Sequence, residues 1–99
     1  METLNVDYAN VNILLFAKAK ELVRKPSMLL KLPTKFSGLD SLLERVETEI
    51  PELKILNRCF VLALNEEYLI EDCTSRPESN EIILKDQDEL AVIPPLSGG

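Results

Sequence analysis

Histidine is absent from this chain of 99 residues, and cysteine occurs only twice, as Cys59 and Cys73. Without histidine the chain cannot build a Ser-His-Asp or Cys-His catalytic site, and most zinc sites are excluded as well. The two cysteines form no C-x-x-C pair, and two thiols alone do not complete a zinc site. Cys59 precedes the apolar run Phe60–Leu62 and is predicted to be a small buried side chain, whereas Cys73 is expected to be partly exposed. The sequence leaves open whether the two form a disulfide.

Aromatic residues make up only 5% of the chain, and tryptophan is absent. The core must therefore be aliphatic, built from Leu, Ile and Val, and a chain of this length forms one small domain. No apolar run approaches the length of a membrane span. The first seven residues carry two acidic groups and no apolar segment of the kind found in signal peptides, so a cytosolic protein is expected.

Positive charge is also in deficit, since 17 acidic against 11 basic residues give a formal net charge of −6. Non-specific nucleic-acid binding needs a basic face, so no nucleic acid is expected as a partner. The balance favours protein partners with basic or mixed clefts, although a run of charges is more often simply a solvated surface.

Strands are expected where β-branched and apolar residues run together. They cover residues 11–16, 27–32, 60–65, 68–70, 82–84 and 89–93. A short helix is expected over 17–23, where helix formers precede a proline, and residues 33–38 are expected to form a loop. The expected divisions are a loose N-terminus over 1–9, a domain over 10–95 and a tail over 96–99.

The main helix is predicted from Leu39 to Ile50, because apolar residues recur there at helical spacing. Ser37 can cap its N-terminus, Asp40 lies near the positive end of the helix dipole, and Pro51 ends it. One helix covering one face of a mixed sheet of four to five strands is an α+β arrangement. The first and last strands are the most continuously apolar, so they are expected side by side at the centre of the sheet.

Glycine is scarce, and two of the three glycines stand together as Gly98 and Gly99. The residues between the last predicted strand and this pair are Pro94, Pro95, Leu96 and Ser97. Proline ends strand pairing, and glycine fits channels too narrow for a side chain. A flexible tail directed away from the body is therefore expected, with a frayed terminus as the plainer alternative.

The chain resembles the small, sulfur-carrier subunits of molybdopterin synthase, which are ubiquitin-like β-grasp proteins. The stretches that carry the resemblance are residues 11–22, 39–46, 62–65 and 86–99. The opening Val-Asn-Ile-Leu-Leu-Phe-Ala run and the Pro-Pro-Leu-Ser-Gly-Gly ending are the specific parts. Gln87 departs from the family, which commonly has glycine between two aspartates, and the segment Cys73–Asn80 is longer than in compact bacterial relatives.

The resemblance implies a function carried by Gly99. It implies that an E1-like adenylyltransferase uses ATP to turn the Gly99 carboxylate into an acyl-adenylate, and that a sulfur donor then displaces AMP to leave a thiocarboxylate. It implies further that the large synthase subunit takes the tail, Pro95 to Gly99, into its active site. There the sulfur attacks cyclic pyranopterin monophosphate, and two rounds complete the molybdopterin dithiolene. Two small and two large subunits are implied, with no catalytic residue, metal or permanently bound cofactor in this chain.

Three alternatives remain open at this point. A sulfur carrier of the same shape could serve tRNA thiolation or thiazole synthesis. A ubiquitin-like modifier would instead join Gly99 to a lysine of a target protein through an isopeptide bond. A plain interaction module would have an inert tail that no partner enzyme adenylates.

Overall fold

A five-stranded mixed sheet forms the body of the molecule in the computed structural model, which describes residues 7–69 and 81–94. The strand order is β2-β1-β7-β4-β5. The strands are β1 (Tyr8–Leu15), β2 (Ser27–Pro33), β4 (Val61–Leu64), β5 (Glu67–Leu69) and β7 (Glu89–Ile93). The expected α+β arrangement is therefore confirmed. Its main sheet has five strands among the described residues, where four to five were predicted.

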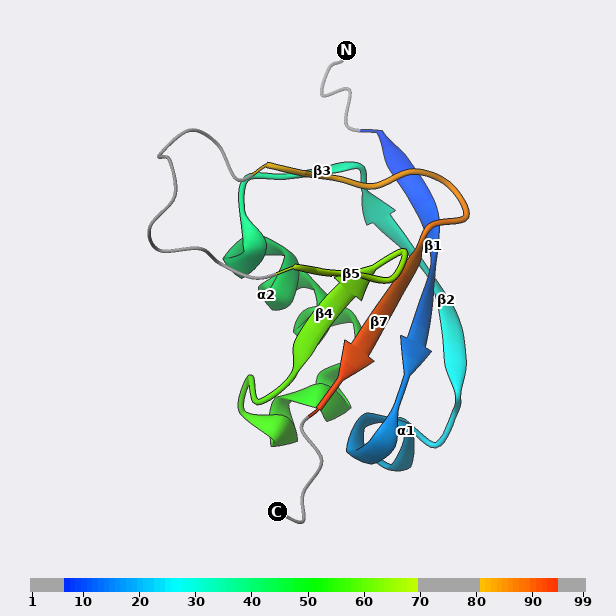
Figure 1. Cartoon of the computed structure of the whole chain (residues 1–99), viewed down its shortest axis with the longest axis vertical. Helices are drawn as coiled ribbons and strands as arrows, with labels where there is room; N and C mark the ends of the chain where they lie inside the picture. The colour runs from blue at the N-terminus through cyan, green and yellow to red at the C-terminus, as the bar shows by residue number, and fades with distance from the viewer. Residues whose placement is uncertain (1–6, 70–80, 95–99) are drawn as a thin grey trace.

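Helices and a smaller sheet complete the fold (Figure 1). The helices are α1 (Ala17–Val23), α2 (Leu39–Glu49) and the 3-10 helix η1 (Pro51–Leu56). Figure 1 shows α2 lying across one face of the sheet, behind β4 and β7 in this view. The short strands β3 (Lys35–Phe36) and β6 (Ile82–Ile83) pair with each other beside this body.

The first and last strands lie at the centre of the sheet, as expected from their continuous apolar sequence. β7 runs parallel to β1, with Leu14 opposite Ala91, and antiparallel to β4, with Leu62 opposite Val92. β7 is thus hydrogen-bonded on both sides, which makes it one of the best-held elements of the molecule. Both central strands end at the same edge of the sheet, next to α1 (Figure 1).

The core lies between the sheet and α2, and it is aliphatic apart from two phenylalanines. Alternate residues of each strand face it, because successive side chains of a strand point to opposite faces. Its fully buried large side chains are Val11, Ile13, Leu15, Leu32, Leu42, Val46, Ile50, Leu53, Leu62, Leu84, Leu90 and Val92. The apolar stripe predicted along the main helix supplies three of these, so that prediction is confirmed.

Several local expectations are corrected. The predicted loop over 33–38 contains β3, which is too short to leave a period-two pattern. Ser37 does not cap α2: Gly38 occupies the N-cap position without a side-chain hydrogen bond, and Ser37 Oγ instead lies 3.3 Å from Ser41 Oγ. Asp40 does lie in the first turn, as predicted.

Two further corrections concern the ends of predicted segments. β1 begins at Tyr8, so residues 8 and 9 lie in the sheet rather than in the loose segment expected over 1–9. Cys59 is free and exposed, not buried, because the chain turns at Asn57 and Arg58 in left-handed conformations and only Phe60 points inward. Cys73 and the segment up to Asn80 lie outside the described residues.

Two tight turns use residues at positive φ. Asn65 (φ 50°) and Glu66 (φ 76°) join β4 to β5, in the pattern of a type I′ hairpin. Gln87 (φ 72°) is the third residue of the turn Lys85–Asp88, which Asp88 N–H closes on Lys85 O at 3.1 Å. This is the position that glycine favours in a type II turn, so glutamine is strained here.

Candidate functional site

The strand β7 leads directly into the tail that the sequence singles out. Its last residue, Ile93, pairs with Val61 of β4, and Phe16 N–H donates to Val92 O at 3.2 Å from the other side. Pro94, which follows, is buried. The chain is therefore firmly held up to Pro94. The predicted tail residues Pro95, Leu96, Ser97, Gly98 and Gly99 lie outside the described residues.

The sheet has a second apolar face, turned away from α2, which we call the outer face. Leu14, Ala91, Ala63 and Tyr68 form a row across it, on β1, β7, β4 and β5. The strand registers fix this row, since Leu14 pairs with Ala91, Ala91 with Ala63, and Ala63 with Tyr68. A second row, nearer to the end of β7, consists of Phe16, Ile93 and Val61.

These apolar side chains on the outer face are largely exposed to solvent, which contributes little to the stability of the fold. Tyr68 is 64% exposed, Phe16 46% and Val61 43%. Phe16 and Tyr68 line a hollow of about 330 Å³, together with Leu14, Ile93, the two alanines and two carboxylates, Glu66 and Glu89. Contiguous exposed apolar groups with a polar edge mark interaction surfaces. The outer face is therefore the best candidate for a protein contact beside the tail.

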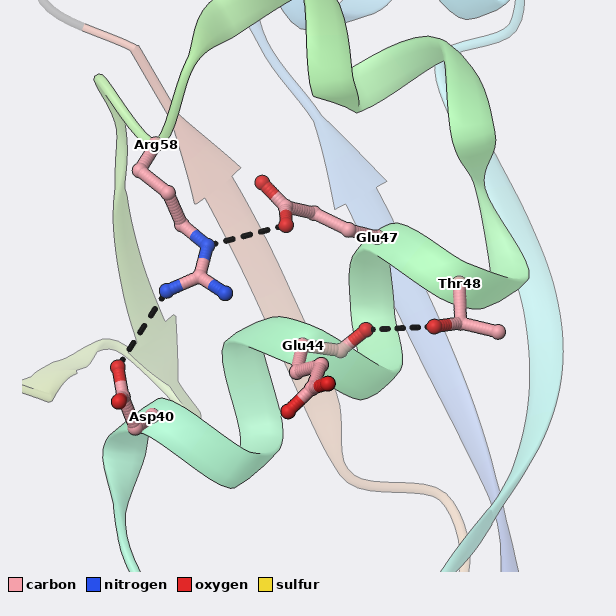
Figure 2. A network of polar contacts seen from close by, with 5 residues as sticks. All are labelled: Asp40, Glu44, Glu47, Thr48 and Arg58. Atoms are coloured by element: carbon pink, nitrogen blue, oxygen red, sulfur yellow. Dashed lines mark hydrogen bonds and ion pairs between the residues drawn. The ribbon is translucent and has the colours of Figure 1, made fainter.

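A separate charged network fixes the chain just before β4 (Figure 2). Arg58 Nε donates to Glu47 Oε1 at 3.0 Å, and Arg58 Nη1 donates to Asp40 Oδ1 at 3.3 Å. Both carboxylates come from the same side of α2, two helical turns apart. Thr48 Oγ1 donates to the backbone oxygen of Glu44 between them, at 2.9 Å.

One positive charge lies between two negative charges in this network. The hydrogen bond with Glu47 raises the pKa of the Arg58 guanidinium, and the nearby Asp40 charge acts in the same direction. The Glu47 side chain is only 13% exposed, so the pair at that end is partly shielded from water. The network ties α2 to the turn that starts β4, and this is a structural role rather than a chemical one.

At the opposite end of the sheet a polar cluster joins the two tight turns. Asp88 accepts hydrogen bonds from Asn65 Nδ2 at 3.0 Å and from Lys85 N–H at 2.8 Å. Asp86 accepts one from Asn10 N–H at 2.7 Å. Both carboxylates thus hold the turns in place, which is a structural role.

Metal and membrane sites find no support in the described part of the chain. No three of its cysteine and carboxylate side chains gather in an arrangement that could hold a metal ion. Across residues 7–69 and 81–94, no helix combines the length and the apolar character that crossing a bilayer requires.

The outer face was missed at the level of sequence, yet a signal for it exists. The runs Ile13–Phe16, Val61–Leu64 and Leu90–Ile93 are apolar at consecutive positions, which is typical of strands covered on both faces. The sequence predicts only one long helix, and one helix covers one face. The second apolar face therefore requires a covering that the helix does not supply.

Comparison with known proteins finds relatives that match nearly the whole chain. A profile of the ThiS family matches residues 13–99. The molybdopterin synthase sulfur carrier subunit of Arabidopsis thaliana is 36% identical over 99 residues, which covers 100% of this chain and 93% of that protein. The subunit of the same name from Drosophila yakuba is 41% identical over 90 residues, which covers 91% of each.

Solved structures share the fold at lower identity. The small archaeal modifier protein 1 of Methanosarcina acetivorans superposes with a TM-score of 0.63 at 23% identity, covering 94% of this chain and 99% of that one. Subunits 1 and 2 of the molybdopterin-converting factor of Helicobacter pylori were solved as a complex, and the matching chain superposes with a TM-score of 0.54 at 22% identity, covering 91% and 99%. These likenesses confirm the ubiquitin-like β-grasp fold expected from the sequence.

Proposed function

This chain belongs to the ThiS family, and from that premise we propose that it is the sulfur carrier subunit of molybdopterin synthase, acting in molybdenum cofactor biosynthesis. The observation that carries the proposal is identity of 36–41% over 88% of the chain or more with curated subunits of that name. The family match also runs through Gly99, the residue on which the chemistry depends.

Gly99 is the residue that reacts. A carboxylate is a poor electrophile, because it is anionic and its oxygen is a poor leaving group. An E1-like adenylyltransferase uses ATP to attach AMP to the Gly99 carboxylate, with release of pyrophosphate. A sulfur donor then displaces AMP and leaves a thiocarboxylate. ATP is thus a substrate of the activating partner, and this chain itself holds no cofactor.

The loaded tail then donates its sulfur inside the large subunit of the synthase. The acceptor is cyclic pyranopterin monophosphate, and two rounds complete the molybdopterin dithiolene. Each round returns Gly99 as a carboxylate for the next activation. Gly98 keeps the approach narrow, while Pro95, Leu96 and Ser97 contact the channel of the partner. A short, stiff connection to β7 lowers the entropy lost when the tail is inserted.

The outer face supplies the docking surface for the large subunit. Phe16, Ile93 and Val61 lie at the end of β7 from which the tail departs, so a protein that accepts the tail also reaches these side chains. The Helicobacter pylori structure is a complex of subunits 1 and 2 of the molybdopterin-converting factor, which supports pairing of this chain with a second subunit. The proposed assembly contains two small and two large chains.

Reconstitution with the activating enzyme, a sulfur source, the large subunit and the pterin precursor tests this function. Gly98→Leu is expected to abolish molybdopterin formation and leave the melting temperature of the free protein unchanged. Gly38→Leu is the matched control, because a Cβ at Gly38 meets no heavy atom within 4 Å and its φ of 179° is open to any residue. Normal synthesis by Gly98→Leu would contradict insertion of the tail.

A further inference from the structure

Two alanines at the middle of the outer face are buried without belonging to the core. Ala63 is 5% exposed and Ala91 is 9% exposed, yet neither packs into the cluster between the sheet and α2. They stand directly opposite each other on β4 and β7, between Leu14 on one side and Tyr68 on the other. The taller neighbours shield them and leave a depression above them, which we call the alanine socket.

Folding alone does not account for these two small residues. Strand positions at the centre of a sheet favour β-branched and aromatic side chains, and alanine is among the residues depleted there. A larger residue at either position would bury more of Leu14 and Tyr68 and stabilise the sheet. The two alanines therefore suit a surface that binds another molecule.

The edge of the socket is acidic. Glu66 and Glu89 line the same hollow, at the end away from the tail. Both side chains are exposed, and no lysine or arginine of the described residues lies within ion-pair distance of either carboxylate. At the other end lie Phe16 and Ile93, so the hollow is apolar towards the tail and negative away from it.

We propose that the alanine socket receives one projecting apolar side chain of the large subunit, and that a basic residue beside it on the large subunit pairs with Glu66 and Glu89. The inference rests on the proposed function and adds to it the point at which the two subunits interlock. The whole hollow measures about 330 Å³, which suits individual side chains rather than a helix, and the socket is only its central part. The acidic edge selects a cationic neighbour, in keeping with the net charge of −6.

A seated side chain of this kind also sets the position of the tail. Ala91 of the socket lies on β7, and the same strand leads through Ile93 to Pro94. A partner residue fixed against Ala91 is thus only a few residues of chain away from the start of the tail. Buried, central contacts surrounded by a less critical ring are where binding energy concentrates.

Calorimetric titration of the full-length chain with the large subunit tests the socket. Ala91→Leu and Ala63→Leu each fill it, and each is expected to raise the Kd about 30-fold or more, the effect of losing one central contact. Ser27→Leu is the matched control: Ser27 pairs with Leu14, so it lies on the same face and in the same row but outside the socket. It is expected to change the Kd less than about threefold, as a peripheral contact does.

Charge reversal tests the acidic edge in the same assay. Glu66→Lys and Glu89→Lys are expected to weaken binding most at low salt, and Glu52→Lys, exposed on η1, supplies the matched change in net charge. Melting curves establish that each variant is folded.

The outcomes separate the socket from the proposed function. Unchanged affinity in both socket-filling variants would overturn the socket, as would equal losses in Ser27→Leu. Equal effects of all three charge reversals would overturn the acidic edge. Failure of the unaltered chain to bind the large subunit would overturn the proposed function instead.

Discussion

The two faces of the central sheet are made by the same strands and differ in what covers them. The inner face carries Val11, Ile13 and Leu90, each 0% exposed beneath α2. The outer face carries two alanines at its centre and half-exposed Phe16 and Tyr68 around them. The inner face has large side chains that pack together in the core, whereas large side chains on the outer face remain partly exposed. A sheet covered by its own helix on one face and by the proposed partner protein on the other is expected to show this difference.

Removing a side chain from the inner face has the largest expected effect on stability. Leu90→Ala is expected to lower the free energy of unfolding by about 3 kcal/mol, because it leaves a cavity in a fully buried site. Ile93→Ala, on the outer face of the same strand, is expected to cost about 1 kcal/mol. Urea denaturation measures both. Equal losses would mean that the two faces are equally part of the core.

Removing a side chain from the outer face reverses the pattern. Phe16→Ala is expected to reduce affinity for the large subunit about 30-fold, which corresponds to about 2 kcal/mol, and to change stability by about 1 kcal/mol or less. Tyr8→Ala is a useful control, since Tyr8 is equally exposed at 47% but lies at the other end of β1. A Phe16→Ala variant that unfolds like Leu90→Ala would remove the distinction.

The Arg58 network ties the helix α2, which covers the inner face, to the turn before β4. Arg58→Ala is expected to cost about 1 kcal/mol, as expected for exposed ion pairs with good geometry. Arg58→Gly loses the same contacts but is expected to cost less, since the backbone at residue 58 has a φ of 65°. If thermal denaturation shows the glycine variant to be the less stable of the two, backbone strain at this turn is not significant.

The smallest expected effect is a gain. Gln87→Gly is expected to stabilise the protein by about 0.5–1 kcal/mol, because it relieves the positive φ of the turn before β7. Affinity for the large subunit is expected to stay unchanged, since this turn lies at the end of the sheet away from the tail. A loss of stability in thermal melts would show that the glutamine side chain contributes more than its backbone costs.

The sequence was sufficient for the features that rest on long patterns. The stripe along α2 and the apolar runs of β1 and β7 each extend over several residues, so they predicted the helix, the sheet and its central pair. It was insufficient for features that rest on contacts between distant residues. β3 has two residues and depends on β6, and Cys59 is exposed because of the turn at Arg58, which the ion pairs to α2 hold in place.

The candidate site divides in the same way. The Gly98–Gly99 ending is a local motif that can be read directly from the sequence. The alanine socket cannot be read in this way, because Ala63 and Ala91 are 28 residues apart and meet only through the pairing of β4 with β7. A consecutive apolar run shows that a strand has two apolar faces, but only the register shows which side chains stand together on each.

Intact-mass analysis of the protein isolated from its own cells tests the central claim most directly, namely that this domain carries sulfur on Gly99 for another protein. The account predicts a species heavier than the unmodified chain by the exchange of one oxygen for one sulfur, located at Gly99 by fragmentation. Treatment with the large subunit and precursor should return it to the unmodified mass. Unmodified carboxylate alone, or Gly99 joined to lysines of other proteins without any thiocarboxylate, would contradict the account.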